Sequence, residues 1–96
     1  MHVLALAVEL HLPDCRSLKA KRSVLKPITE GARRRFNVAV AETDHQNTWQ
    51  RAAIGVAAVS ATPHHAEEVI DEVERFICSF PNLQVLSVTR SWMEID

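Results

Sequence analysis

The apolar residues of this chain recur at two different spacings, and the order in which those spacings follow one another restricts the fold more than any other feature. Alternation at every second residue, typical of a β-strand with one buried face, marks four segments: residues 2–12, 37–41, 49–61 and 83–95. Spacing of three and four residues, typical of an amphipathic helix, marks residues 17–35 and 62–80. The 96 residues are therefore predicted to form one domain with the element order β-α-β-β-α-β.

Local signals support the ends of both predicted helices. Ser17 is a favoured N-cap residue, and Thr62 followed by Pro63 combines an N-cap with a proline that fits the first helical turn. Pro13 ends the first strand and Pro81 ends the second helix, because proline lacks the backbone N–H that would continue either element. Short turns are therefore expected at these points.

The right-handed preference of crossover connections turns this element order into a specific topology. We predict a four-stranded antiparallel sheet with both helices on one face, which is the ferredoxin-like α+β fold. The first and third strands are central in that topology. Their large apolar residues are expected to face the helices: Leu4, Leu6, Val8, Ile54, Val56 and Ala58.

The opposite face of the predicted sheet carries small apolar residues, where a sheet facing water would show threonine, lysine and glutamate. Its expected members are Ala5, Ala7, Ala39, Ala41, Ala53, Gly55 and Ala57. Such a face is suited to another sheet or to a second copy of the chain, so a homodimer or a protein-interaction module is one hypothesis. The alternative is that dispersed alanines simply tolerate water.

Charge is divided unequally between the two predicted helices. Residues 16–35 contain eight basic side chains and one acidic side chain, whereas residues 62–80 contain five acidic side chains and one basic side chain. The candidate RNA-contacting residues are Lys19, Lys21, Arg22, Lys26, Arg33 and Arg34. Four of these would form one outward stripe that can follow a phosphate backbone: Lys19, Arg22, Lys26 and Arg33. The same charges could instead pair with the acidic helix or a neighbouring subunit, or face water.

A polar cluster near the end of the second strand is the strongest candidate for catalytic chemistry. Glu42, Asp44 and His45, with Glu9 and His11 as potential neighbours, can be imagined as an acid–base pair or a metal site. A solvated strand end explains them better, because a metal site requires a defined ligand number and geometry. We therefore expect no catalytic residue, no metal or other cofactor, and no small-molecule substrate.

Composition excludes several further classes of protein. Two glycines, Gly31 and Gly55, cannot form a Gly-rich phosphate loop. Cys15 and Cys78 lack metal-binding or thiol-exchange spacing and predict reduced thiols, although a helix start after Cys15 is a reason to expect a lowered thiol pKa. The apolar N-terminal stretch is too short to cross a bilayer, and the net charge of -1 gives no attraction to membranes. A cytoplasmic protein without a membrane partner is expected.

The segment DHQNTWQRA, residues 44–52, joins the second and third strands. His45 to Thr48 are predicted to form the polar loop of the hairpin, and Trp49 is predicted to open the next strand. The indole either covers the end of the sheet or contacts a partner, because it combines a large apolar area with one N–H donor. Trp49 is therefore kept as a candidate partner contact beside its structural role.

Two stretches resemble the signature sequences of the YlxP-like proteins, a small bacterial family of unknown function. They are SLKAKRSVLKPI, residues 17–28, and FNVAVAETDHQNTWQRAAIGVAAVS, residues 36–60. The resemblance covers nearly the whole chain and implies a ferredoxin-like fold. Members are often encoded beside transcription and translation factors, which suggests a role near RNA or the ribosome. The family offers no established catalytic residues to transfer.

Three hypotheses about function follow. The leading one is a non-enzymatic module that contacts structured RNA or a ribosomal component through the basic first helix. The second is a protein-interaction or homodimerisation module that uses the alanine-rich sheet face. An enzyme that uses Glu42, Asp44 and His45 is a remote third.

Overall fold

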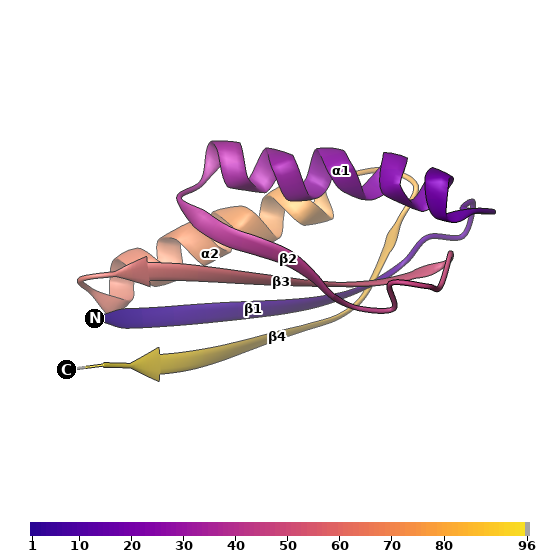
Figure 1. Cartoon of the computed structure of the whole chain (residues 1–96). Coiled ribbons are helices and arrows are strands. Elements are labelled where there is room, and N and C mark those ends of the chain that lie inside the picture. The colour runs from indigo at the N-terminus through magenta and orange to yellow at the C-terminus, as the bar shows by residue number, and fades with distance from the viewer. Residues whose placement is uncertain (96) are drawn as a thin grey trace.

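The computed structural model describes residues 1–95 and shows six elements in the predicted order (Figure 1). They are β1 (His2–His11), α1 (Leu18–Arg35), β2 (Val38–Asp44), β3 (Arg51–Ser60), α2 (Pro63–Cys78) and β4 (Gln84–Glu94). The strand order is β2-β3-β1-β4, and each neighbouring pair is antiparallel. Both helices pack on one face of the sheet and leave the other face open (Figure 1). The ferredoxin-like prediction is confirmed, with β1 and β3 at the centre.

Both helices begin at the predicted caps. Ser17 Oγ accepts a hydrogen bond from the backbone N–H of Ala20 at 3.0 Å, and Thr62 Oγ1 accepts one from the N–H of His65 at 3.3 Å. Pro63 occupies the first turn of α2, where its missing N–H leaves no helical bond unmade. In the described part of the chain, neither helix is long and apolar enough to cross a membrane.

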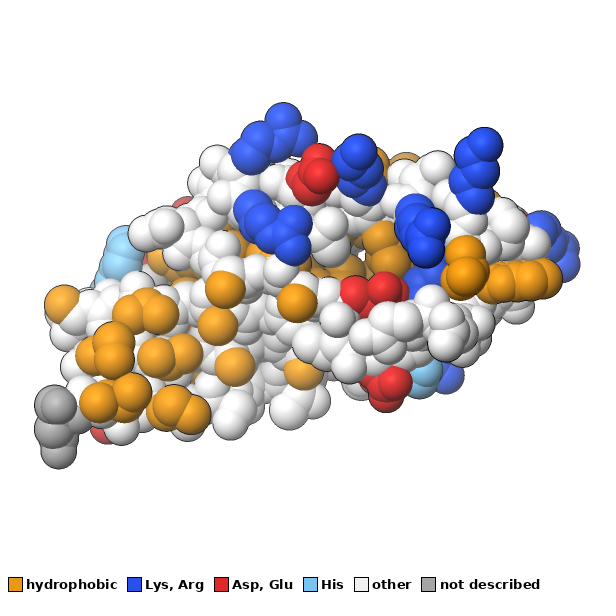
Figure 2. Space-filling view, in the orientation of Figure 1, with side chains coloured by type: hydrophobic (Ala, Val, Ile, Leu, Met, Phe, Trp, Pro, Cys, Tyr) orange, Lys and Arg blue, Asp and Glu red, His pale blue; other side chains and the backbone are white. Residues whose placement is uncertain are grey.

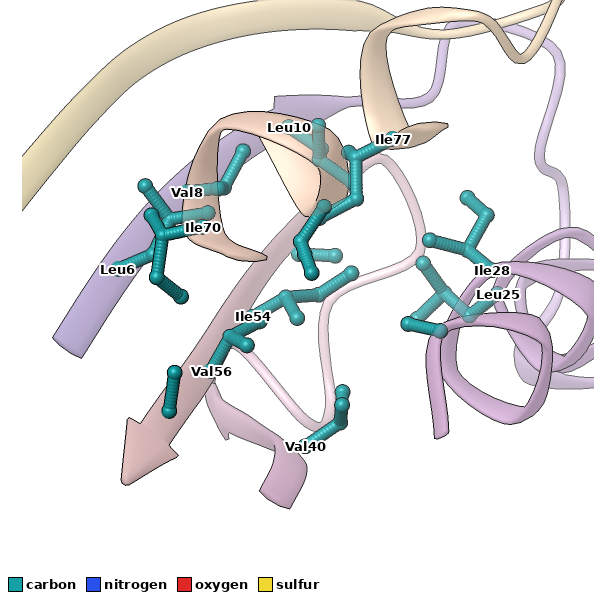
Figure 3. Packing of buried hydrophobic residues seen from close by; sticks show 14 of the residues in the cluster. Leu6, Val8, Leu10, Leu25, Ile28, Val40, Ile54, Val56, Ile70 and Ile77 are labelled. Atoms are coloured by element: carbon teal, nitrogen blue, oxygen red, sulfur yellow. The ribbon is translucent and has the colours of Figure 1, made fainter. Parts of the chain in front are cut away.

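One hydrophobic core fills the space between the sheet and the helices (Figure 3). The register of β1 and β3 places the predicted helix-facing residues opposite one another: Leu4 with Ala58, Leu6 with Val56, and Val8 with Ile54. All six are buried, as predicted. Ile28 of α1 and Ile70 and Ile77 of α2 cover them from the helical layer. This packing fixes both helices against the sheet and so decides which of their side chains face water.

The connection between β2 and β3, residues 45–50, departs from the sequence prediction and is named the β2–β3 loop. β3 begins at Arg51, so the prediction that Trp49 opens this strand is wrong. The carbonyl of Gln50 accepts a hydrogen bond from the N–H of Leu12 at 2.9 Å, and the carbonyl of His45 accepts one from the N–H of Thr48 at 3.0 Å. These bonds hold the backbone on either side of Trp49 in a turn that packs beside the chain leaving β1.

Candidate nucleic-acid interface

The outer side of α1 carries a continuous group of cationic side chains, named the α1 basic surface. Its members are Lys19, Arg22, Lys26, Arg33 and Arg34, all of which are exposed. Figure 2 shows lysine and arginine side chains gathered along this helix and few acidic side chains among them. α1 has 18 residues and is therefore about 27 Å long. The surface is long enough to meet several successive phosphates of one strand.

The acidic residues of α2 do not neutralise this surface. Asp71 and Glu74 both pair with the guanidinium of Arg90 on β4, at 2.8 and 3.1 Å. Among residues 1–95, no ion pair joins α1 to α2. The contact between the helices is instead aromatic, since the Arg35 guanidinium lies 5.0 Å from the ring centre of Phe76. The positive charge on the outer side of α1 therefore remains directed at solvent.

A groove of about 340 Å³ lies along α1 beside β2. Three members of the α1 basic surface, Arg22, Lys26 and Arg33, line it together with Thr29. Arg33 Nη2 donates a hydrogen bond to the carbonyl of Val40, which fixes the guanidinium against the edge of β2. Two carboxylates, Glu30 and Glu42, also line the groove and offset part of its positive charge.

Lys21 does not belong to the α1 basic surface, and its assignment as an RNA contact is wrong. Lys21 is buried, with 2% of the residue exposed. The Nζ atom lies 2.9 Å from Glu42 Oε2 in an ion pair that lacks hydrogen-bond geometry, and it donates a hydrogen bond to the carbonyl of His45. The sequence does indicate that Lys21 faces the core. It lies four residues before Leu25 and seven before Ile28, and residues at these spacings share one helix face. Lys21 therefore joins α1 to the end of β2.

The polar cluster predicted as a remote catalytic alternative is divided by a bulge. The pairing of β2 with β3 shifts between Glu42, which lies opposite Ile54, and Asp44, which lies opposite Ala53. The extra residue places Glu42 on the helical face and Asp44 on the open face of the sheet, although simple alternation along the strand would put both on one face. Asp44 Oδ1 accepts a hydrogen bond from the N–H of His45 at 2.8 Å. Glu42 and Asp44 consequently do not form an acid–base pair.

His45 is instead part of a different cluster at the same end of the sheet. Glu9 Oε2 lies 3.2 Å from His45 Nε2 and accepts a hydrogen bond from Arg51 Nη2 at 3.0 Å. His11 lies outside this cluster, because its Nδ1 lies 3.0 Å from Gln84 Oε1. No group of three histidine, cysteine, aspartate or glutamate side chains within residues 1–95 is placed to hold a metal ion. The cluster links β1, β3 and the β2–β3 loop.

The open face of the sheet gathers most of the predicted small residues into two rows. Across the strand order β2-β3-β1-β4, the first row consists of Ala39, Ala57, Ala5 and Ser91. The second row aligns Ala41, Gly55, Ala7 and Thr89 in the same order of strands. A shallow hollow of about 530 Å³ lies over both rows. Ala53 is an exception, because it is 6% exposed and does not line the hollow.

Sequence reasoning missed a third row that continues this face toward the chain ends. Val3 lies between Val59 of β3 and Met93 of β4. Val59 is 59% exposed and Met93 is 61% exposed, which is unusual for large apolar side chains. The strand alternation of residues 2–12 and 49–61 contained the signal, since Val3 shares its parity with Ala5 and Ala7, and Val59 shares its parity with Ala57. The open face is therefore more apolar than the alanines alone predict.

The remaining candidates, Trp49 and Cys15, are not among the residues that define the two surfaces. Trp49 projects from the β2–β3 loop and is half-exposed. Cys15 is a free, buried thiol in the segment before α1. Burial raises the pKa of the Cys15 thiol, the charge of Asp14 raises it further, and Lys21 acts in the opposite direction. The expectation of a lowered thiol pKa is wrong, because desolvation by burial is the largest influence on this pKa and raises it.

The comparisons with known proteins agree with the fold and with the resemblance seen in the sequence. The family model described as "Protein of unknown function (DUF503)" matches residues 3–90. The uncharacterized protein YlxP of Bacillus subtilis (strain 168) is 40% identical over 79 residues, which cover 82% of this chain and 86% of that protein.

Two solved structures show the same fold at low sequence identity. A de novo designed protein with a ferredoxin fold is 15% identical, with a TM-score of 0.55 over 100% of this chain and 89% of that chain. A C-terminal segment of the alpha subunit of aIF2 from Pyrococcus abyssi is 16% identical, with a TM-score of 0.50 over 98% of this chain and 51% of that chain. From the family match and the identity to YlxP, we conclude that the chain belongs to the YlxP-like DUF503 family of proteins of unknown function.

Proposed function

We propose that this protein is a non-enzymatic, cytoplasmic binding module that contacts structured RNA, free or within a ribosomal component, through the α1 basic surface. The observation that carries the proposal is the set of five exposed cations on one side of α1, without acidic partners from α2. Cations placed in this way neutralise phosphates and release their counterions, which is the main source of affinity in sequence-independent binding. The function of the surface is therefore to grip a nucleic-acid backbone.

The sheet is a weaker candidate for reading RNA than the helix. Sheets that bind single-stranded RNA offer aromatic side chains on their central strands, on which bases stack. The corresponding open face of β1 and β3 carries Ala5, Ala7, Gly55 and Ala57. Contacts from α1 to phosphates position the protein but carry little sequence information. We therefore expect recognition of RNA shape and charge more than of sequence.

The test of this proposal is the salt dependence of RNA binding. A variant with Lys19→Gln, Arg22→Gln and Lys26→Gln should reduce the magnitude of the slope of log K against log[salt] by about 3, because each lost phosphate contact reduces it by about 1. The measurement is equilibrium binding to a panel of structured and single-stranded RNAs over a salt series. Circular dichroism establishes that the variant is folded, which is expected because all three side chains are exposed.

A matched pair of single variants tests whether RNA binding depends on the α1 basic surface or only on the total positive charge of the protein. Arg22→Gln on α1 and Arg75→Gln on α2 each remove one exposed guanidinium from a helix. Arg22→Gln should weaken RNA binding and Arg75→Gln should leave it unchanged. Equal effects of the two variants, or a wild-type protein that binds no RNA at about 50 mM salt, would contradict the proposal.

A second candidate function is self-association through the open sheet face, favoured by the exposed third row of Val3, Val59 and Met93 beside the apolar hollow. A second copy of the chain presents the same uncharged rows, and two such faces can pack as a sheet sandwich. Ala57→Glu places a charge at the centre of this face and should convert a dimer into a monomer. Light scattering over a concentration series measures the mass.

Salt and a control variant distinguish this association from charge pairing. Apolar association of the sheets should persist at about 1 M salt, where ionic contacts are screened within about 3 Å. Ser79→Glu, which adds the same charge at the exposed end of α2, should leave the mass unchanged. A wild-type protein that is monomeric at every concentration would exclude the second candidate.

A further inference from the structure

Trp49 is an exposed indole presented by a fixed loop. It is 50% exposed, although a large aromatic side chain gains most stability when it is covered. The β2–β3 loop is held on both sides of it, by the bond from Leu12 to the carbonyl of Gln50 and by the bond from Thr48 to the carbonyl of His45. Gln50 Nε2 also donates to the carbonyl of Pro13 at 3.3 Å. The loop therefore presents the indole in a fixed position, so binding costs little free energy for ordering the loop.

The immediate surroundings of the indole are polar and uncharged. A shallow cavity of about 340 Å³ is lined by Asn47, Thr48, Trp49 and Gln50. Asn47 contributes an amide group and Thr48 a hydroxyl group, which both donate and accept hydrogen bonds. Gln50 Nε2 is already bonded to the carbonyls of Pro13 and Cys15, so Gln50 offers its Oε1 as an acceptor. Among residues 1–95, no carboxylate lines this cavity. An aromatic surface flanked by amide and hydroxyl groups matches the face and the edge of a nucleobase.

Cations of α1 begin at the same end of the molecule. The β2–β3 loop lies beside the start of α1 (Figure 1). Gln50 Nε2 contacts the carbonyl of Cys15 at 3.5 Å, and the next residue is the exposed Arg16. The buried Lys21 bonds to the carbonyl of His45 and so ties the loop to the first turns of α1. A phosphate chain leaving a base bound at the β2–β3 loop would therefore start at the end of the molecule where the cations of α1 begin (Figure 1).

We propose that Trp49 stacks on an unpaired base of the RNA whose backbone lies along the α1 basic surface, with Asn47 and Gln50 facing the edge of that base. This inference rests on the proposed function and specifies its ligand as a helical RNA segment that adjoins at least one unpaired nucleotide. Trp is also common at protein–protein hot spots, but the exposed cations Arg16 and Lys19 at the start of α1 favour a polyanion, against the opposing charges of Asp14 and Asp44 near the loop. Stacking on an aromatic side chain tolerates every base, so the site reads strandedness and not sequence.

The chain allows this stacking to be observed directly, because it contains two tryptophans and no tyrosine. In a Trp92→Phe variant, Trp49 is the sole indole, and its fluorescence reports on the β2–β3 loop. Titration compares an RNA hairpin that carries a short unpaired extension with the same hairpin lacking the extension. We expect quenching of Trp49 by the extended hairpin and little quenching by the blunt one.

Affinity provides a second readout. Trp49→Ala should weaken binding of the extended hairpin by about 5- to 150-fold, which corresponds to the loss of one stacked base, and leave binding of the blunt hairpin unchanged. Trp49→Phe keeps an aromatic face and should retain much of the difference between the two RNAs. Trp92→Phe, on the edge strand β4, serves as the matched tryptophan control and should affect neither RNA.

The outcomes separate this inference from the proposed function. If Trp49→Ala changes both hairpins equally or changes neither, stacking is excluded while binding through α1 stands, and a protein becomes the better partner for the indole. If the α1 triple variant binds as wild type does and quenching persists, stacking stands without the α1 interface. If neither hairpin binds, a single-stranded tetranucleotide at low salt tests stacking alone. If it does not quench the fluorescence of Trp49, the inference is overturned.

Discussion

Replacing Lys21 by alanine is expected to destabilise the protein strongly, although the residue lies on a basic helix where most lysines are dispensable. Removal of one partner of a buried ion pair costs about 3–5 kcal/mol, because the other charge remains uncompensated. The side chain of Lys21 is 3% exposed and that of Glu42 is 28% exposed, so we expect the lower end of this range. The substitution also removes the hydrogen bond to the carbonyl of His45. Urea unfolding followed by circular dichroism measures the loss.

Two comparisons isolate the ion pair from the general effect of shortening a lysine. Lys19→Ala removes the same side chain from an exposed position two residues earlier and should change the free energy of unfolding by less than about 0.5 kcal/mol. A double variant, Lys21→Met with Glu42→Leu, removes both charges and should be much more stable than Lys21→Ala, because no buried charge is left unpaired. Equal losses for Lys21→Ala and Lys19→Ala would show that the pair contributes nothing.

The other large effect is expected in the core, where Ile70→Ala should lower the free energy of unfolding by about 2–5 kcal/mol. Ile70 is fully buried on α2 and faces the sheet near Leu6 and Val8 (Figure 3). The loss combines the transfer of the removed methyl and methylene groups to water with the cavity left behind. Domains of this kind have a total stability of about 5–15 kcal/mol, so a single core truncation removes a large share of it.

Graded variants test whether packing is the cause. Ile70→Val removes one methyl-sized group and should cost about 0.5–1.5 kcal/mol. Val59→Ala truncates an apolar residue that is 59% exposed on the open sheet face and should stay within about 0.5 kcal/mol of wild type if the measurement is made on a monomer. An Ile70→Ala loss no larger than that of Val59→Ala would contradict the core described above.

The fold was predictable because its signals are local and agree with one another. Alternation placed Leu4, Leu6 and Val8 on one face of β1, and the helix starts were marked by cap residues at Ser17 and Thr62. The bulge after Glu42 was not predictable, because no glycine or proline marks it and one inserted residue reverses every later side chain in the strand. The start of β3 was misplaced for a related reason. Trp49 has a high strand propensity, but the turn bond from Thr48 to His45 holds the chain just before it in a loop.

The candidate sites were predictable to the extent that they follow helix and strand periodicity. Five of the six proposed RNA contacts are exposed on α1. Lys21 is buried, because it lies on the helix face that packs against the sheet and its charge is paired with that of Glu42. The link between Glu9, His45 and Arg51 joins three separate parts of the chain, so only the three-dimensional arrangement reveals it. The same holds for the position of the β2–β3 loop beside the start of α1 (Figure 1).

The two helices cover one face of the sheet and leave the other open, so the α1 basic surface belongs to the helical layer and the open face to the sheet layer (Figure 1). A pair formed back to back through the open faces would leave each α1 on the outside of the assembly. Such an assembly is bivalent: when one helix holds a long RNA, the second experiences a raised effective concentration of the same molecule. The two α1 basic surfaces of one dimer would then bind two sites on the same RNA, and weak contacts with individual phosphates would add up to a higher overall affinity.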